Sequence, residues 1–306
     1  MVKIDRIVCP VDFSDFSRRA LDYAVALARW YGARLTVLHV HHAPFSAATQ
    51  LAPLAPVEPV VVTPIDLEQI RSRIAAFTPA EAQALVPVEP KAAEGDPARE
   101  ILAEAASADV IVMGTHGRSG FERLVLGSVT EKVLRKATCS LLTIPLAAPP
   151  AGAVPVLFRR IVAAIDFSSV SMSALRHAAS LAAEVAAHLT VMHVIEAPER
   201  LELWIDGDEA TSYVRRWTEG AERRLRGAVS DETREYAYVM QRVETGRAYR
   251  EILRVADEQQ ADLIVIGAHG HGVLEAMFVG STAQHIVRAA ACPVLMVRQR
   301  SSRGGR

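Results

Sequence analysis

The sequence contains only three cysteines, Cys9, Cys139 and Cys292, and no two of them form a CxxC pair. They make no disulfide framework, and isolated thiols of this kind are typical of reduced core or interface positions in a cytosolic protein. Long hydrophobic runs are missing too, since every apolar stretch is too short to span a bilayer. No early stretch has the form of a signal peptide. We therefore expect a soluble, cytoplasmic protein with no membrane partner.

An excess of charge of either sign is also missing. The chain has 34 basic and 35 acidic residues, for a net charge of -1. Nucleic-acid binding requires a strongly basic face, so we expect no nucleic-acid partner. Half of the 306 residues are apolar and 23% are charged. These proportions allow the chain to bury a sizeable core.

What the sequence does contain is one motif, present twice. The letters G-T-H-G at 114–117 are followed by nine residues and G-S at 127–128. The same layout recurs as G-A-H-G at 267–270, nine residues, and G-S at 280–281. Neither copy contains the Walker lysine motif or the dinucleotide pattern G-x-G-x-x-G. Each copy follows an apolar run and leads into a helical pattern, which indicates a different kind of phosphate-binding loop.

The rest of the chain is duplicated in the same order. R-I-V-C-P-V-D-F-S at 6–14 matches R-I-V-A-A-I-D-F-S at 160–168, and L-T-V-L-H-V at 35–40 matches L-T-V-M-H-V at 189–194. Each unit has the length of an ordinary domain, so the pattern predicts two tandem domains. We divide the chain into a first domain (1–147), a linker (148–157), a second domain (158–299) and a disordered basic tail (300–306).

Within the first repeat, short runs rich in β-branched residues alternate with segments of helical periodicity. A Pro-rich stretch at 43–64 is too broken for a regular helix. Strands are expected at 7–11, 34–41, 85–92, 110–113 and 140–144, and helices after Ser14 or Ser17 up to Gly32 and at 65–77, 98–106 and 128–136. The alternation predicts an α/β fold: in each half, a doubly wound five-stranded parallel sheet with helices on both faces.

The polar residues at the strand ends indicate where a ligand would bind. Asp12 ends the first strand and Gly114 ends the fourth, and ligands of such sheets bind beyond the carboxyl ends of the strands. Glycines allow a close approach of backbone N–H groups, and a helix N-terminus favours an anion. Ser128 and Thr130 add hydroxyl groups, and Arg118 adds positive charge. The simpler alternative is a tight turn and a capped helix without a ligand.

With these motifs the chain resembles the universal stress protein family, in particular its tandem members of the ATP-binding type. The resemblance covers both halves and implies five-stranded domains with the strand order 3-2-1-4-5. It implies ATP, with or without Mg²⁺, as the ligand. It also implies that Asp12 and Val40 contact the adenine and ribose, and that phosphates are held by Gly114, Gly117, Gly127, Ser128 and Val129. The matching positions of the second half are Asp166, Val194, Gly267, Gly270, Gly280, Ser281 and Thr282. We add their neighbours Pro10, Met113, His116, Arg118, Thr130, Ile266 and His269 as candidate binding residues.

The second copy departs from the first near the expected phosphates. His271 stands in place of Arg118, and Ala276 in place of Arg123. Exposed charge pairs contribute about 1 kcal/mol or less each, so this loss should weaken binding without abolishing it. We expect the first site to bind ATP more tightly.

Other clusters allow two interpretations each. His39, His41 and His42 could bind a metal, but only His39 recurs in the second half, as His193, which favours a structural role. Asp12 and Asp166 could each hold a divalent ion, yet one carboxylate per domain makes no two-metal site. The charged segment at 208–226 could dock a partner or form a solvated face over an aromatic contact.

The function expected from these features is that of a stress-response or regulatory protein that ATP switches between states, acting on a protein client. No catalytic residue is visible. A slow ATPase or phosphotransferase, and a scaffold whose loops stay empty, are the alternatives. The fifth strand of each domain ends its sheet, and exposed edges invite pairing. We therefore expect the two repeats to pair as an intramolecular pseudo-dimer, with a homodimer as a family-level expectation only.

Overall fold

The computed structural model describes residues 3–42, 66–117, 126–151, 158–196, 207–270 and 279–299. The elements in chain order are β1 (Arg6–Pro10), α1 (Asp15–Tyr31), β2 (Arg34–His41), α3 (Leu67–Phe77), α4 (Ala80–Leu85), β3 (Val88–Glu94), α5 (Pro97–Ala105), β4 (Val110–Gly114), α6 (Ser128–Lys136), β5 (Ser140–Ile144), β6 (Arg160–Ala164), α7 (Ser169–Val185), β7 (His188–Ile195), α9 (Gly207–Ala228), α10 (Asp231–Tyr236), β8 (Tyr238–Thr245), α11 (Ala248–Glu258), β9 (Leu263–Gly267), α12 (Ser281–Ala289) and β10 (Val294–Val297). None of the helices in these ranges is long and apolar enough to cross a membrane.

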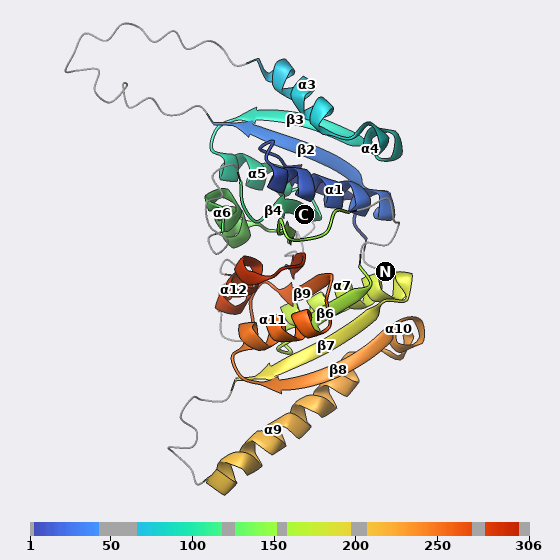
Figure 1. Cartoon of the computed structure of the whole chain (residues 1–306), viewed down its shortest axis with the longest axis vertical. Helices are drawn as coiled ribbons and strands as arrows, with labels where there is room; N and C mark the ends of the chain where they lie inside the picture. Colours follow the sequence, from blue (N-terminus) through green and yellow to red (C-terminus); the bar gives the residue numbers. More distant parts are fainter. Residues whose placement is uncertain are drawn as a thin grey trace, which may run out of the picture.

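The strands of the described residues form one ten-stranded sheet in the order β3-β2-β1-β4-β5-β10-β9-β6-β7-β8. Each half therefore has the order third, second, first, fourth, fifth, as expected. Pairing within each half is parallel, whereas β5 and β10 pair antiparallel, with Thr143 opposite Val294. The expectation that the two fifth strands pair with each other is confirmed. Figure 1 shows the two halves stacked end to end, with this seam between them.

Local sequence explains where the long helices begin and end. Ser14 caps α1 by accepting a hydrogen bond from the backbone N–H of Ser17, and Ser168 caps α7 by the same bond from Ser171. Gly32 ends α1 in the left-handed conformation, at φ 63°. Serine is preferred at the N-cap because its side chain accepts a hydrogen bond from a free backbone N–H, and glycine is preferred at the end because it adopts the left-handed conformation without strain. The two caps place both helices directly after the Asp-Phe-Ser segments.

Some boundaries differ from the prediction. The expected strand at 85–92 is wrong at its start, because Leu85 ends the short helix α4 and the strand β3 covers Val88–Glu94. Pro87 cannot continue a helix, so the strand begins after it. The helix expected at 65–77 begins at Leu67, since the Asp66 side chain caps it. The Pro-rich stretch (43–64), Ile65 after it, part of the linker (152–157) and the tail (300–306) lie outside the described residues.

Both faces of the sheet carry a core that runs through both halves. Val110 and Val112 of β4 belong to the core under α1 and α7. The alternate residues, Ile111 and Met113, belong to the core under α5, α6, α11 and α12. Alternate residues of a strand point to opposite faces, which gives the two cores. The single sheet and the shared cores make the two halves one packed unit.

The seam between the halves carries specific polar contacts. Arg298, which follows β10, is 9% exposed and donates from Nη2 to the carbonyl oxygens of Leu134 (2.9 Å) and Arg135 (3.2 Å) in α6. Arg288 of α12 pairs with Glu131 of α6 at 3.2 Å. These bonds satisfy carbonyl groups at the end of α6 and join it to the other half of the molecule.

Candidate functional site

The first part of each site is a turn directly after the first strand of the half. Asp12 Oδ1 accepts hydrogen bonds from the Ser14 backbone N–H (3.1 Å) and hydroxyl (2.5 Å). In the second half, Asp166 Oδ1 accepts from the Ser168 backbone N–H at 3.0 Å. The residue between them has a positive φ in both copies, 64° at Phe13 and 66° at Phe167. A bulky residue rarely adopts this conformation, so the turn is a strained feature that both repeats keep.

A histidine on the second strand supports this turn. His39 Nδ1 lies 2.7 Å from the Val11 carbonyl oxygen, and its ring packs on Phe13 at 4.5 Å between centroids. His193 makes the equivalent contact with the Ile165 carbonyl oxygen at 2.8 Å. Burial lowers the pKa of His39. These contacts give both histidines a structural role, and the described residues contain no group of three or more side chains arranged to hold a metal ion.

The second part is the last glycine of each four-residue segment, Gly117 in G-T-H-G and Gly270 in G-A-H-G. This glycine lies against the aspartate of the turn. A Cβ on Gly117 would be 2.8 Å from Asp12 Oδ2, and one on Gly270 would be 2.1 Å from Asp166 Oδ2. Neither distance is tolerated without a shift of the carboxylate. Glycine at these positions therefore brings the loop backbone and the carboxylate together.

The third part is the start of the following helix. Gly127 and Gly280 are the N-caps of α6 and α12, and neither helix has a side-chain cap. The serine-capped α1 and α7 differ in this respect. Gly127 N–H donates to the Thr115 carbonyl oxygen and Gly280 N–H to the Ala268 carbonyl oxygen, both at 2.9 Å. The first-turn amides of α6 and α12 are thus placed beside the loop, where an anion could accept from them.

Three residues near these helices have surroundings that the sequence did not predict. Thr130 is 4% exposed, and its hydroxyl donates to the Gly114 carbonyl oxygen at 3.0 Å, so it ties α6 to the end of β4. A direct contact of Thr130 with phosphate stays a prediction. His269 Nδ1 and His116 Nε2 are buried, and neither has a hydrogen-bond partner within the described part of the chain.

In the second half these parts enclose a cavity of about 880 Å³. That volume is within the range of about 300–1,000 Å³ of small-molecule sites. The second-half candidate binding residues all line it, namely Asp166, Val194, Ile266, Gly267, His269, Gly270, Gly280, Ser281 and Thr282. The structure therefore gathers them at one edge of the sheet, from β6, β7, β9 and the start of α12.

The wall opposite α12 comes from α9, which sequence reasoning missed as part of a site. Figure 1 shows α9 running beside β7 and β8. Its residues in the cavity lining are Arg216, Trp217, Gly220, Ala221 and Arg224. The Arg224 guanidinium lies 3.9 Å from the centre of the Phe167 ring. One face of the charged segment thus lines the cavity and contacts an aromatic ring, and docking of a partner by this segment stays a prediction. The available signal was the spacing of Arg216, Gly220 and Arg224, which lie four residues apart and share one helical face.

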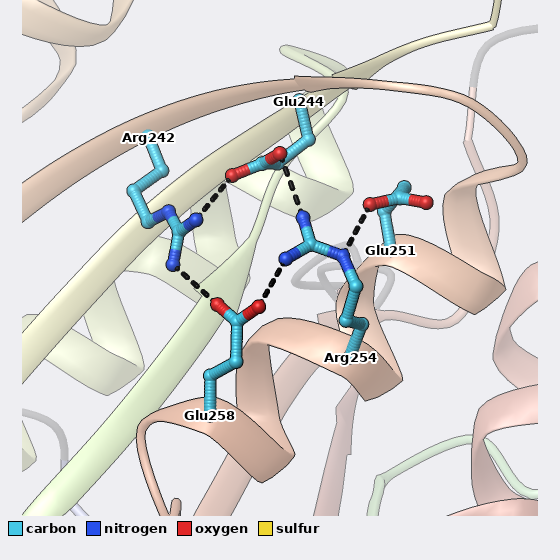
Figure 2. Close-up of polar contacts among 5 residues, drawn as sticks. All are labelled: Arg242, Glu244, Glu251, Arg254 and Glu258. Atoms are coloured by element: carbon cyan, nitrogen blue, oxygen red, sulfur yellow. Dashed lines mark hydrogen bonds and ion pairs between the residues drawn. The ribbon is translucent and has the colours of Figure 1, made fainter.

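Another wall, α11, is fixed to the sheet by an ion-pair network (Figure 2). Arg242 of β8 contacts Glu244 at 2.7 Å and Glu258 of α11 at 3.0 Å. Arg254 of α11 contacts Glu244 at 2.7 Å and Glu251 at 2.8 Å, and it also pairs with Glu258. Hydrogen bonds from Arg242 and Arg254 hold the pKa of the Glu258 carboxyl below its usual value. The network holds the helix whose Ala248 and Ile252 line the cavity.

The first half places its residues in the same order, although its site is described only in part. Pro10 ends β1, Val40 pairs with Ala93 near the end of β2, and Met113 is buried at the end of β4. Ser128 and Val129 open α6. The positions on which the predicted difference between the sites depended, Arg118, Arg123, His271 and Ala276, lie outside the described residues.

The cysteines are packing residues. Cys9, Cys139 and Cys292 are all buried free thiols. Burial, with a smaller effect of the Asp262 charge, raises the pKa of Cys292 to about 12, and burial also raises that of Cys9. A thiol with a raised pKa is a poor nucleophile at neutral pH, which agrees with the core role expected from the sequence.

Comparison with known proteins identifies the fold's family. The model of the universal stress protein family matches residues 3–145 and again 157–298. A universal stress protein of Mycolicibacterium smegmatis is 26% identical over 314 residues, covering 96% of this chain and 97% of that protein. One of Thermus aquaticus is 35% identical over 144 residues, covering 46% of this chain and all of that protein. The crystal structure of a universal stress protein from Archaeoglobus fulgidus, 23% identical, has the same fold, with a TM-score of 0.65 over 98% of this chain and 100% of that one. The chain therefore belongs to the universal stress protein family, with two tandem copies of the family's domain.

Proposed function

We propose that the protein binds adenine nucleotides, ATP in particular, and acts as a nucleotide-dependent regulator in a stress response. The observation that carries this proposal is the second-half cavity, where the uncapped start of α12 and the Asp166 carboxylate share one space. A polyphosphate needs clustered backbone N–H donors, and a ribose needs an acceptor for its hydroxyl groups. The cavity supplies both.

Each group has a distinct task in this proposal. The amides at the start of α12 and the Ser281 hydroxyl would bind phosphate oxygens. The Asp166 carboxylate, oriented by Ser168, would accept hydrogen bonds from the ribose. Asp12, Ser128 and the start of α6 would do the same in the first half. Any Mg²⁺ would be bound together with the nucleotide, through its phosphate oxygens.

The regulatory part of the proposal concerns what nucleotide binding could do without hydrolysis. A nucleotide can shift a protein between two states only through different affinities for them. The loops that connect β4 to α6 and β9 to α12 are where a bound phosphate would act. We propose that nucleotide occupancy changes the surface that these loops offer to a protein client, and that the location is cytoplasmic.

Titration calorimetry of the full chain with ATP tests the binding. Wild-type protein should bind two equivalents. Gly270→Ala should weaken the second one, because the new Cβ, 2.1 Å from Asp166 Oδ2, would displace the carboxylate that is proposed to accept from the ribose. Gly227→Ala is the matched control, since a Cβ there meets no atom within 4 Å and Gly227 lies outside the cavity lining.

The same protein distinguishes the alternatives. No heat of binding at millimolar ATP, and no adenine nucleotide released from heated protein, would leave only the empty scaffold. Formation of ADP over time that decreases in Ser128→Ala or Ser281→Ala and disappears when both are changed would instead identify a slow ATPase. The proposed regulator requires that two equivalents of ATP bind to each chain and that the bound ATP is not hydrolysed.

A further inference from the structure

The second cavity is elongated along the carboxyl edge of the sheet. Its lining runs from α9, which packs on β7 and β8, past Asp166 at the end of β6, to β9 and the start of α12. In the sheet order, β8 and β7 lie on one side of β6 and β9 lies on the other. A nucleotide with its phosphates on α12 therefore has its nucleoside end directed toward α9.

The wall at that end is aromatic and basic. Trp217 lines the cavity and is 43% exposed. Arg216 precedes it, and Arg224 lies two turns further along, stacked on Phe167 at 3.9 Å. An indole face and guanidinium planes are the groups on which a nucleic base stacks.

Small residues make room on the same wall. Gly220 lies in the middle of α9, where glycine is less favourable for a helix than alanine. A Cβ added at Gly220 would meet no heavy atom within 4 Å, and the neighbouring Ala221 also lines the cavity. Larger side chains at these positions would extend into the space that faces Trp217.

We propose that α9 is the base-recognition wall of the second site, with Trp217 stacking on the purine of a bound adenine nucleotide and Arg216 and Arg224 flanking it. This inference rests on the proposed function and adds which end of the ligand each wall binds. It also distinguishes the two sites. The corresponding segment of the first half, residues 42–87, contains no tryptophan. There Arg73 stacks on Phe13 at 4.0 Å, as Arg224 does on Phe167, but the aromatic side chain beside it is Phe77.

Base stacking is worth about 1–3 kcal/mol per base, which is roughly 5- to 150-fold in affinity. Removal of Trp217 should therefore affect ligands that carry a base and spare those that consist of phosphates alone. The second site, with this wall, should bind ATP more tightly than the first, the reverse of the expectation from loop charges.

The test uses the full chain with Gly117→Ala in every variant to weaken the first site, and the calorimetry is fitted with two independent sites, of which only the second should respond to changes in α9. Calorimetry with ATP, adenosine and inorganic tripolyphosphate compares the parent with Trp217→Leu. The variant should lose about tenfold or more in affinity for ATP and adenosine and keep its tripolyphosphate affinity. ATP should also quench tryptophan fluorescence in the parent but not in Trp217→Leu.

Two glycine variants of the same helix provide a second measurement. Gly220→Leu should obstruct adenosine binding, whereas Gly227→Leu, outside the lining, should not. Equal losses for adenosine and tripolyphosphate in Trp217→Leu, or unchanged ATP affinity, would overturn the inference while nucleotide binding by the parent stands. Failure of the parent to bind any of the three ligands would overturn the proposed function and the inference together.

Discussion

At the scale of single residues, the strongest agreement between the two halves is the strained turn after the first strand. Phe13 and Phe167 both have a positive φ, and each is followed by a serine bonded to the preceding aspartate. Such a conformation costs about 1–3 kcal/mol, and it persists because the histidine behind it and the arginine above it pack on the phenylalanine ring. The result is a carboxylate held in one orientation beside a glycine.

His177 is a residue whose titration should affect stability. It lies in α7 at the junction of the halves, near Phe158 and Tyr31, and burial lowers its pKa from 6.5. As the pH falls below 6.5, the unfolded chain takes up a proton before the folded chain does, so the free energy of unfolding decreases until the pH is below the folded pKa. Urea unfolding at pH 7.5 and 5.5 should therefore show a smaller pH effect in His177→Gln than in wild type. The same decrease in both proteins would contradict this role.

At the scale of elements, the same strand order accepts different helices between the second and third strands. The first half has α3 there, and the second has the 22-residue α9. Leu225 and Val229, at the end of α9 and just beyond it, belong to the core. Its preceding turns extend over the cavity. Packing of its C-terminal turn holds the adjoining turns, from Arg216 to Arg224, over the site.

Gly220 should limit the stability of α9 itself. Gly220→Ala should raise the free energy of unfolding by about 0.5–1 kcal/mol, because alanine has the higher helix propensity and the new Cβ has open space. Gly32→Ala is the contrasting control, since φ is 63° there and alanine would be strained although no atom is near. Urea unfolding at pH 7.5 measures both, and a decrease in the free energy of unfolding for Gly220→Ala would refute the account.

At the scale of the whole molecule, the β5–β10 seam converts two edges into the centre of one sheet. Exposed edges favour association with other chains, and pairing within the chain removes two of them. The seam also places α6 and α12 on neighbouring sides of the same junction, where Arg288 pairs with Glu131 (Figure 1).

Arg298 should be the main polar contributor to this junction. Arg298→Met keeps most of the side-chain volume but leaves the carbonyl groups of Leu134 and Arg135 without their donor. Leaving buried acceptors unsatisfied costs about 1–3 kcal/mol. Arg288→Met is the control, because its pair with Glu131 also crosses the junction but is partly exposed and should contribute less than about 1 kcal/mol. Equal effects on urea unfolding would show that burial of Arg298 is not what matters.

The sequence by itself determined the two tandem domains, the residues of the two loops and, through the family resemblance, the strand order in each half. These are recorded in local patterns: the alternation of strands and helices, and glycines at fixed spacing. Tertiary structure alone decided that Thr130 bonds to Gly114, that the two cores run through both halves, and that α9 closes the second cavity. Contacts of this kind join residues far apart in the chain, so no local pattern encodes them. The charge pattern of α9 indicates which face of the helix is polar. Only the packing of α9 on β7 and β8 decided that residues of the helix line the second cavity.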